Sequence, residues 1–206
     1  IDVSKLSIFY GENEVCNDVN FIVENGDRIA ICGKNGCGKS SVLKLILGIQ
    51  GSSINFRDSP EGKSCFRHAN FEGQSINFTG EINISSGLKI SYVSQDTSYL
   101  RGNLTDFCKD YNIDESLFKA ILRKLDFSRT QFSKNIEDFS GGQKKKVLIA
   151  KSLCEEAHLY IWDEPLNFID VLSRIQIENL ILEYKPTMIF VEHDKIFSEK
   201  IATQIV

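Results

Sequence analysis

The stretch GKNGCGKS, residues 33–40, decides the fold of this chain, because it fits the phosphate-binding pattern G-x-x-x-x-G-K-[ST]. It follows the apolar run RIAIC (residues 28–32) and precedes the helix-like run SVLKLIL (residues 41–47). A strand, a glycine-rich loop and a helix in this order favour phosphate binding, since loop N–H groups and the helix N-terminus both attract anions. In such a loop Lys39 can reach the β- and γ-phosphates of a nucleotide, and the Ser40 hydroxyl can bind Mg²⁺.

The composition fits one domain with a substantial core. The chain has 206 residues, of which 42% are hydrophobic and 10% aromatic, and we expect residues 1–206 to form a single domain. No apolar run approaches the roughly 18 residues of a membrane-spanning helix, and no charged-then-apolar leader opens the sequence.

We interpret the start at Ile1 and the end at Val206 as those of a piece of a longer protein. The six cysteines lack paired metal-ligand spacing, which favours free thiols, and the net charge of −4 disfavours a general nucleic-acid-binding surface.

Hydrophobic periodicity predicts strands and helices in alternation. The predicted strands lie in residues 1–10, 19–32, 80–84, 88–93, 158–162 and 187–191, and the predicted helices are residues 40–48, 114–125, 142–154 and 171–184. Asn25-Gly26 predicts a β-hairpin turn, and Gly48 is expected to end the first helix. Residues 51–79, rich in Ser, Asn and Gly without a clean period, are expected to be a flexible insertion, either a mobile loop or a poorly ordered hairpin. This order predicts an α/β fold with a mainly parallel sheet core, an antiparallel β lobe and a small helical lobe.

A second short motif, FSGGQ at residues 139–143, lies among further markers along the chain. In sequence order these markers are Tyr10, the glycine-rich loop, Gln95 in YVSQD, the FSGGQ motif, the strand HLYIWD followed by Glu164, the segment NFID at residues 167–170, and His193. Together they resemble the nucleotide-binding domain of the ATP-binding cassette (ABC) superfamily of P-loop NTPases, across almost the whole chain. The resemblance therefore implies ATP as the ligand and Mg²⁺ as its cofactor.

The resemblance also implies an ATPase and assigns its site residues. Glu164 is expected to polarise the attacking water as general base, and His193 to contact the γ-phosphate and orient that water. The expected ATP-binding residues are Tyr10, Gly33, Asn35, Gly36, Cys37, Gly38, Lys39, Ser40, Ser41 and Gln95. The expected metal-binding residues are Ser40, Gln95 and Asp163, the last of them through the water shell of Mg²⁺.

In this family the signature motif contacts the ATP of another domain. Ser140, Gly141, Gly142 and Gln143 are expected to cap the γ-phosphate of an ATP bound by a second cassette, from a helix N-terminus. Asn167 and Asp170 match the D-loop. A complete ATPase site therefore requires a second cassette, which lies within the same polypeptide if the full-length protein has two.

The segment DEPLNFID resembles the D-E-P-T-N-H-L-D pattern of the ABC-F family, tandem ATPases that act on the ribosome. Together with KISYVSQD and FSGGQKKKVLIAKSL it resembles the branch that protects ribosomes against lincosamides, streptogramin A and pleuromutilins, and specifically the second cassette. Leu166, Phe168 and Phe139 depart from the usual Thr, His and Leu. The resemblance implies ribosome binding in the cytoplasm, with no membrane subunit.

Two other functions remain open from the sequence. The alternative to ribosome protection is the ATP-binding subunit of an ABC transporter, and a cassette in DNA repair or chromosome maintenance is disfavoured because no coiled-coil insertion is present. The run Lys144-Lys145-Lys146 suggests either an RNA contact or, with more support from the core-like residues that follow it, a solvated face of the signature helix.

Overall fold

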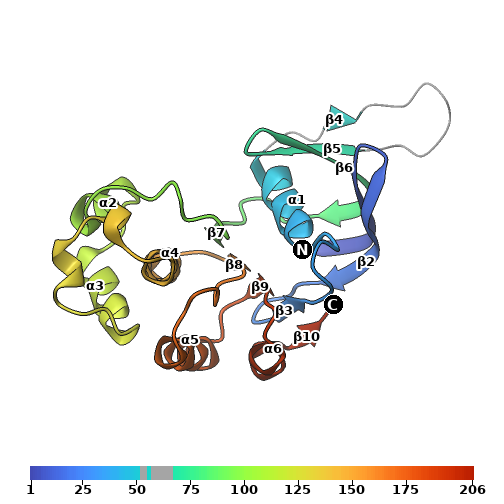
Figure 1. Ribbon diagram of the computed structural model, residues 1–206. Coiled ribbons are helices and arrows are strands. Elements are labelled where there is room, and N and C mark those ends of the chain that lie inside the picture. The colour runs from blue at the N-terminus through green and yellow to red at the C-terminus, as the bar shows by residue number, and fades with distance from the viewer. Residues whose placement is uncertain (52–54, 57–66) are drawn as a thin grey trace.

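The computed structural model describes residues 1–51, 55–56 and 67–206, which form two five-stranded sheets with helices around them (Figure 1). The antiparallel sheet has the order β2 (Asn13–Ile22), β1 (Asp2–Tyr10), β6 (Gln74–Asn83), β5 (Arg67–Phe71), β4 (Asn55–Phe56). The parallel sheet has the order β10 (Gln204–Ile205), β3 (Arg28–Ile31), β9 (Met188–Val191), β8 (Leu159–Asp163), β7 (Ile90–Val93).

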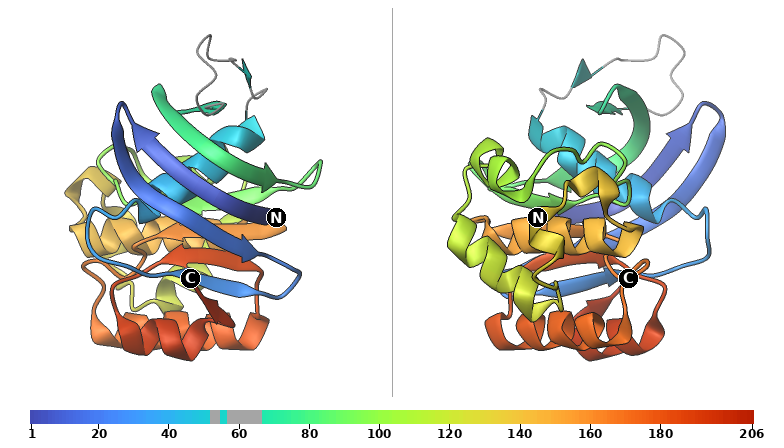
Figure 2. Two further views of the ribbon diagram at one scale, coloured as in Figure 1. Left: turned by 90° about the vertical axis from the view of Figure 1, so that its right-hand side faces the viewer. Right: turned by 60° about the vertical axis from the view of Figure 1, so that its left-hand side comes forward.

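The parallel sheet is covered by helices on both faces. Helix α1 (Lys39–Gly51) packs between the two sheets, and α4 (Gly141–Cys154), α5 (Val171–Tyr184) and α6 (Lys195–Ile201) cover the other face (Figure 2). Side chains of a strand alternate between the faces, so Ile189 and Val191 join the core around α1, whereas Met188 and Phe190 join the core on the side of α4 to α6. Burial on both faces explains why β9 is a continuous apolar run.

A small helical lobe extends to one side of the parallel sheet (Figure 1). It consists of α2 (Leu104–Asp110), α3 (Glu115–Lys124) and two short 3-10 turns, Gln131–Ser133 and Ile136–Asp138, and it leads into α4. Asn103 and Asp114 cap the N-termini of α2 and α3, accepting from the N–H groups of Asp106 and Leu117. The expected α/β class with a parallel core, an antiparallel lobe and a helical lobe is confirmed.

The register of the parallel sheet determines where the functional segments meet. Val191 pairs with both Ile31 and Asp163, and Val93 pairs with Trp162. The segments that follow these strands are the glycine-rich loop, Glu164, His193 and Gln95, and they all leave the sheet at its carboxyl edge. Ligands of open α/β sheets bind at this edge.

The hairpin predicted at Asn25-Gly26 is wrong, because β2 and β3 belong to different sheets. Strand β2 pairs instead with β1, whereas β3 pairs in parallel with β9 and β10. The Gly26 N–H donates to Thr187 Oγ1 at 2.8 Å, so the turn is attached to the parallel sheet. Three of the four residues of β3 are buried, which places this strand in the core rather than in a hairpin.

The prediction that Gly48 ends the first helix is also wrong, since α1 continues to Gly51. Gly48 lies where α1 crosses β5, and a Cβ atom there would come within 2.9 Å of the Asn70 carbonyl oxygen. The glycine therefore permits close packing of the helix on the sheet.

The segment 51–79 is only partly as expected. Residues 67–71 and 74–79 belong to β5 and β6, which pair as an antiparallel hairpin, so the loop interpretation is wrong for them. The strand pairing agrees with the hairpin interpretation, and the expected flexibility stays a prediction. Residues 52–54 and 57–66 lie outside the described part of the chain. The predicted strands 80–84 and 88–93 separate into β6 of one sheet and β7 of the other.

Candidate functional site

A pocket at the carboxyl edge of the parallel sheet brings together most of the residues singled out in the sequence. Its lining residues are Tyr10, Val15, Asn35, Gly36, Gly38, Lys39, Ser40, Ser41, Gln95, Glu164, Asn167 and His193. They come from β1, β2, the start of α1 and the segments after β3, β7, β8 and β9. Residues far apart in sequence thus face one cavity.

The glycine-rich loop wraps around the N-terminus of α1. Gly36 and Gly38 have φ of 79° and 87°, a backbone region that favours glycine, and a Cβ at Gly38 would come within 3.0 Å of the Val15 carbonyl oxygen. The first turn of α1 contains no acidic residue, so the positive end of the helix dipole faces the pocket without an internal counter-charge. These features make the loop a suitable anion cradle.

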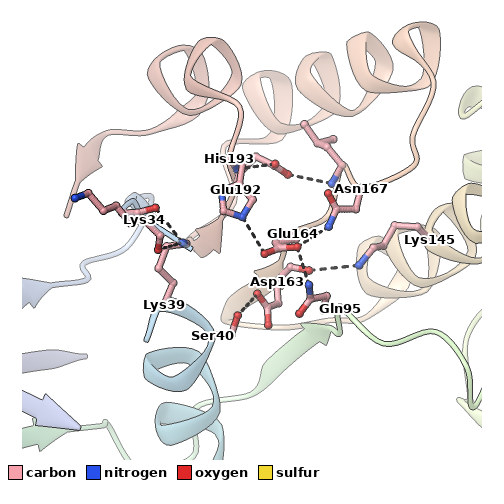
Figure 3. A network of polar contacts seen from close by, with 12 residues as sticks. Lys34, Lys39, Ser40, Gln95, Lys145, Asp163, Glu164, Asn167, Glu192 and His193 are labelled. Atoms are coloured by element: carbon pink, nitrogen blue, oxygen red, sulfur yellow. Dashed lines mark hydrogen bonds and ion pairs between the residues drawn. The ribbon is translucent and has the colours of Figure 1, made fainter. Parts of the chain in front are cut away.

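Lys39 is the cation of this cradle. Its side chain is buried, and Nζ donates to the carbonyl oxygens of Gly33 at 3.0 Å and Lys34 at 2.9 Å (Figure 3). The ammonium is thus held at the loop, where it can exchange these carbonyls for phosphate oxygens of a ligand.

Ser40 and Asp163 form the oxygen pair expected of a magnesium site. Ser40 Oγ donates to Asp163 Oδ1 at 2.9 Å, and Asp163 is almost fully buried at the end of β8. Burial raises the pKa of Asp163, against the lowering effect of the Ser40 hydrogen bond. A hydroxyl and a carboxylate are ligands that fit Mg²⁺, so the residues present suit the expected ion.

Glu164 is the centre of a polar network (Figure 3). Its Oε2 accepts from Gln95 Nε2 at 2.8 Å and from the Asn167 side chain, and its Oε1 lies 3.1 Å from His193 Nε2. Glu164 adopts φ of 48°, a left-handed conformation that is uncommon for this residue type. The structure therefore brings the expected base, histidine, glutamine and D-loop asparagine into direct contact.

The remaining expected nucleotide contacts differ in position. Tyr10, at the end of β1, is 37% exposed and donates from its hydroxyl to Ser41 Oγ at 3.1 Å, and both residues line the pocket. Gly33 and Cys37 belong to the loop but do not line the pocket. A Cβ at Gly33 would meet Cys37 Sγ at 2.6 Å, so this thiol is turned toward the loop backbone.

The signature residues lie outside this pocket. Ser140 caps α4, accepting from the Gln143 N–H at 3.3 Å, while Gln143 Oε1 accepts from the Ser140 N–H at 3.0 Å. Gly142 is so close to the D-loop that a Cβ would lie 2.2 Å from the Phe168 carbonyl oxygen. The motif is thus packed against the D-loop, and no signature residue lines the described pocket.

Neither expectation for the lysine run fits Lys145 and Lys146, because both are buried. Lys145 Nζ donates to the carbonyl oxygens of Ser94 at 2.8 Å and Asp163 at 3.3 Å, which connects α4 to the segments that carry Gln95 and Glu164. Burial lowers the pKa of Lys145 to about 8, while the charges of Asp163, Glu164 and Glu192 oppose this shift. Neither a solvated face nor an RNA contact describes these two residues.

Lys146 stabilises the D-loop. Its Nζ lies 2.6 Å from Asp170 Oδ2, and Asp170 in turn caps α5 by accepting from the Ser173 N–H at 2.9 Å. Although burial opposes the shift, the hydrogen bonds from Lys146 and Ser173 lower the pKa of Asp170. The expected D-loop residues Asn167 and Asp170 thus make different contacts, one to Glu164 and one to α4 and α5.

Sequence reasoning missed Glu192, a buried acid between β9 and His193. Its Oε2 accepts from the Leu166 N–H at 3.1 Å and its Oε1 from the His193 N–H at 2.8 Å. The detectable signal was an acid directly before the histidine, at the end of an apolar strand.

The fold and the pocket define a P-loop nucleotide-binding domain. The sequence profile described as ABC transporter matches residues 16–167. "ATP-binding protein Uup" of Buchnera aphidicola is 30% identical over 91% of this chain, and "Ribosome protection protein VmlR" of Bacillus subtilis is 27% identical over 97%. "ABC transporter F family member 2" of Arabidopsis thaliana is 28% identical over the whole chain. The chain therefore belongs to the ABC transporter family, as an ATP-binding domain of ABC-F type.

Solved structures agree with this fold. An archaeal ribosome recycling factor, crystallised with a ribosomal stalk protein, matches the whole chain and 36% of its own length with a TM-score of 0.72 at 20% identity. An ATP-binding subunit of an ABC transporter matches with a TM-score of 0.69 at 23% identity, over 84% of its length. The chain spans 29%, 28% and 32% of the lengths of the Uup, F family member 2 and VmlR relatives. In the described residues, the helices fall short of the length and hydropathy that a membrane crossing requires.

Proposed function

We propose that this chain is one ATP-hydrolysing cassette of a ribosome-associated ABC-F protein. The observation that carries the proposal is the network of Gln95, Glu164 and His193, which lies in one pocket with Lys39 and Ser40. A carboxylate held by side-chain hydrogen bonds beside a phosphate cradle is suited to polarise water for attack on a terminal phosphate.

Each pocket residue has a role in this proposal. Glu164 takes up the proton of the attacking water, while His193, 3.1 Å from Glu164, orients the water and the γ-phosphate. Lys39 and the loop N–H groups hold the β- and γ-phosphates, and Tyr10 stacks on the base at the mouth of the pocket. Ser40, Asp163 and Gln95 hold Mg²⁺, which supplies charge neutralisation on the phosphate oxygens when it is bound.

The position of the signature supports the need for a second cassette. None of the residues Ser140 to Gln143 lines the chain's own pocket, and they form the N-terminus of α4, a 14-residue helix with no acidic residue in its first turn. We propose that this surface caps the ATP of the second cassette, with Asn167 and Asp170 holding the D-loop beside it.

A finer proposal concerns the branch. The relative named for ribosome protection, together with the DEPLNFID segment, supports membership in the antibiotic-resistance branch, in which this chain is the second cassette. On this proposal the partner is the ribosome, the site of action is the cytoplasm and no membrane subunit takes part.

The first test is nucleotide binding to the pocket. Fluorescent ATP should bind the wild-type chain, and Lys39→Ala should weaken binding by about 10- to 100-fold, because a charge-assisted hydrogen bond is worth about 1.5–3 kcal/mol. Lys134→Ala, an exposed lysine of the helical lobe, is the matched control. Equal affinity for ATP in the Lys39→Ala and wild-type proteins would show that Lys39 does not bind the phosphates of the nucleotide.

The second test separates the ribosome from a membrane partner. The full-length protein with Glu164→Gln, incubated with MgATP, should sediment with ribosomes and not with membranes. Sedimentation with membranes would instead identify the alternative, an ATP-binding subunit of an ABC transporter.

A further inference from the structure

Glu192 occupies a place where a charged side chain requires an explanation. It follows β9 directly, only 7% of its surface is exposed, and it does not line the nucleotide pocket. A buried carboxylate is costly unless its oxygens are hydrogen-bonded. The hydrogen-bond partners of the two Glu192 oxygens therefore indicate what this side chain stabilises.

Both partners are backbone N–H groups of the two segments that carry Glu164 and His193. Oε2 accepts from the Leu166 N–H at 3.1 Å, and Oε1 accepts from the His193 N–H at 2.8 Å. Pro165 has no N–H, so Leu166 provides the first main-chain donor after Glu164. The Glu164 N–H itself donates to the Val191 carbonyl oxygen at 3.0 Å.

We propose that Glu192 is a positioning residue for ATP hydrolysis, fixing the segment after Glu164 against the segment of His193 so that these two side chains stay in contact. The proposal rests on the proposed function, in which Glu164 and His193 act on the water. Glu192 does not line the pocket, so in this proposal it acts through the backbone at Leu166 and His193 and not on the nucleotide itself. Its contribution is geometric, because small displacements of reacting groups reduce rates strongly.

The two-acceptor arrangement predicts an order among variants. Glu192→Ala removes both acceptors and should lower the rate of hydrolysis by about 10- to 100-fold. Glu192→Gln keeps one acceptor oxygen and places an NH₂ group against the other N–H. The rate of hydrolysis should therefore fall less than in Glu192→Ala, by about 3- to 10-fold. Since the pocket lining is unchanged, the affinity for MgATP should stay within about twofold of wild type in both.

The test measures rate, affinity and backbone protection together. The full-length protein, in excess over radiolabelled ATP, gives the single-turnover rate, and titration with fluorescent ATP gives the affinity. Amide hydrogen exchange of the 206-residue chain gives a readout that does not depend on activity, and exchange should rise at Leu166 and His193 in the Glu192 variants. Glu199→Gln, an exposed acid on α6, is the matched control and should behave as wild type.

The outcomes separate this proposal from the proposed function. If the wild type hydrolyses ATP and Glu192→Ala does so at the same rate, the positioning role is refuted while the ATPase stands. A parallel loss of rate and ATP affinity would show a general structural role and also refute it. A wild type that fails to bind ATP would refute the proposed function, and the positioning role with it.

Discussion

At the scale of single residues, Glu164 combines an uncommon backbone conformation with three side-chain partners. Its φ of 48° turns the carboxylate into the pocket, where Gln95, Asn167 and His193 contact it. Strained backbone of this kind is concentrated at functional sites, because surrounding contacts must maintain it. The backbone conformation and the three partners therefore fix the Glu164 carboxylate in one orientation.

We predict that Glu164→Gln leaves ATP binding intact and lowers turnover by about 10²- to 10⁴-fold, since the amide keeps the shape but lacks the basicity to accept a proton. Single-turnover hydrolysis and equilibrium binding measure the two effects separately. The exposed acid Glu156, changed to Gln, serves as control. Hydrolysis near the wild-type rate would show that another group acts as base.

At the scale of elements, the packing of α1 on β5 depends on the close approach of the two backbones at Gly48. Gly48 has ordinary helical geometry, so Ala would normally stabilise the helix by about 1 kcal/mol. A Cβ atom would, however, come within 2.9 Å of the Asn70 carbonyl oxygen.

We predict that Gly48→Ala destabilises the protein by about 1–2 kcal/mol, because a clash with backbone outweighs the gain in helix propensity. Urea denaturation gives the change in the free energy of unfolding. A stability equal to or above wild type would show that α1 can shift away from β5 at little cost.

The junction between α4 and α5 depends on Asp170, which caps α5 and pairs with Lys146. Its pKa is lowered on folding, so it contributes stability above its unfolded pKa near 4, and that contribution is lost as the pH falls toward the folded value. Asp170→Asn keeps the capping oxygen but loses the charge.

We predict that Asp170→Asn is less stable than wild type by up to about 1 kcal/mol at pH 7, a modest value because the aspartate is half exposed. The difference should shrink as the pH is lowered below about 4, because the unfolded wild-type chain then binds a proton at Asp170 that the folded chain does not bind. Urea denaturation at pH 7 and pH 3 measures it. A difference that does not change with pH would assign the effect to the cap rather than the charge.

At the scale of the whole molecule, the pocket proposed for the nucleotide and the signature residues occupy two separate places on the described chain. The pocket opens at the carboxyl edge of the parallel sheet, and the signature lies at the start of α4, against the D-loop. If the signature serves the ATP of a second cassette, one copy holds two half-sites.

We predict that ATP turnover by this chain rises more than linearly with its concentration, because active sites then form by pairing of two copies. Specific activity measured across a dilution series, with the mass followed by light scattering, decides this. Constant specific activity from a proven monomer would show that one copy contains a complete site.

Local sequence determined the glycine-rich loop and the class of fold. Three features depend on neighbouring residues alone: the loop pattern, the cap at Asp170 and the helix at residues 171–184. Their local conformational preferences do not require distant contacts. The resemblance to ABC domains predicted which segments meet in the pocket. It did not predict a role for Glu192.

Tertiary structure decided what depends on distant contacts. Strand β3 pairs with β9 rather than β2, because its buried residues fit the interior of the parallel sheet better than a solvent-exposed hairpin. Lys145 and Glu192 are charged, and local sequence places such residues on the surface. Inside the fold, however, Lys145 donates to carbonyl groups 51 and 18 residues away, and Glu192 accepts from the Leu166 N–H, 26 residues away, as well as from the adjacent His193 N–H. A buried charge is tolerated only where the whole fold supplies its partners, so no local pattern could predict it.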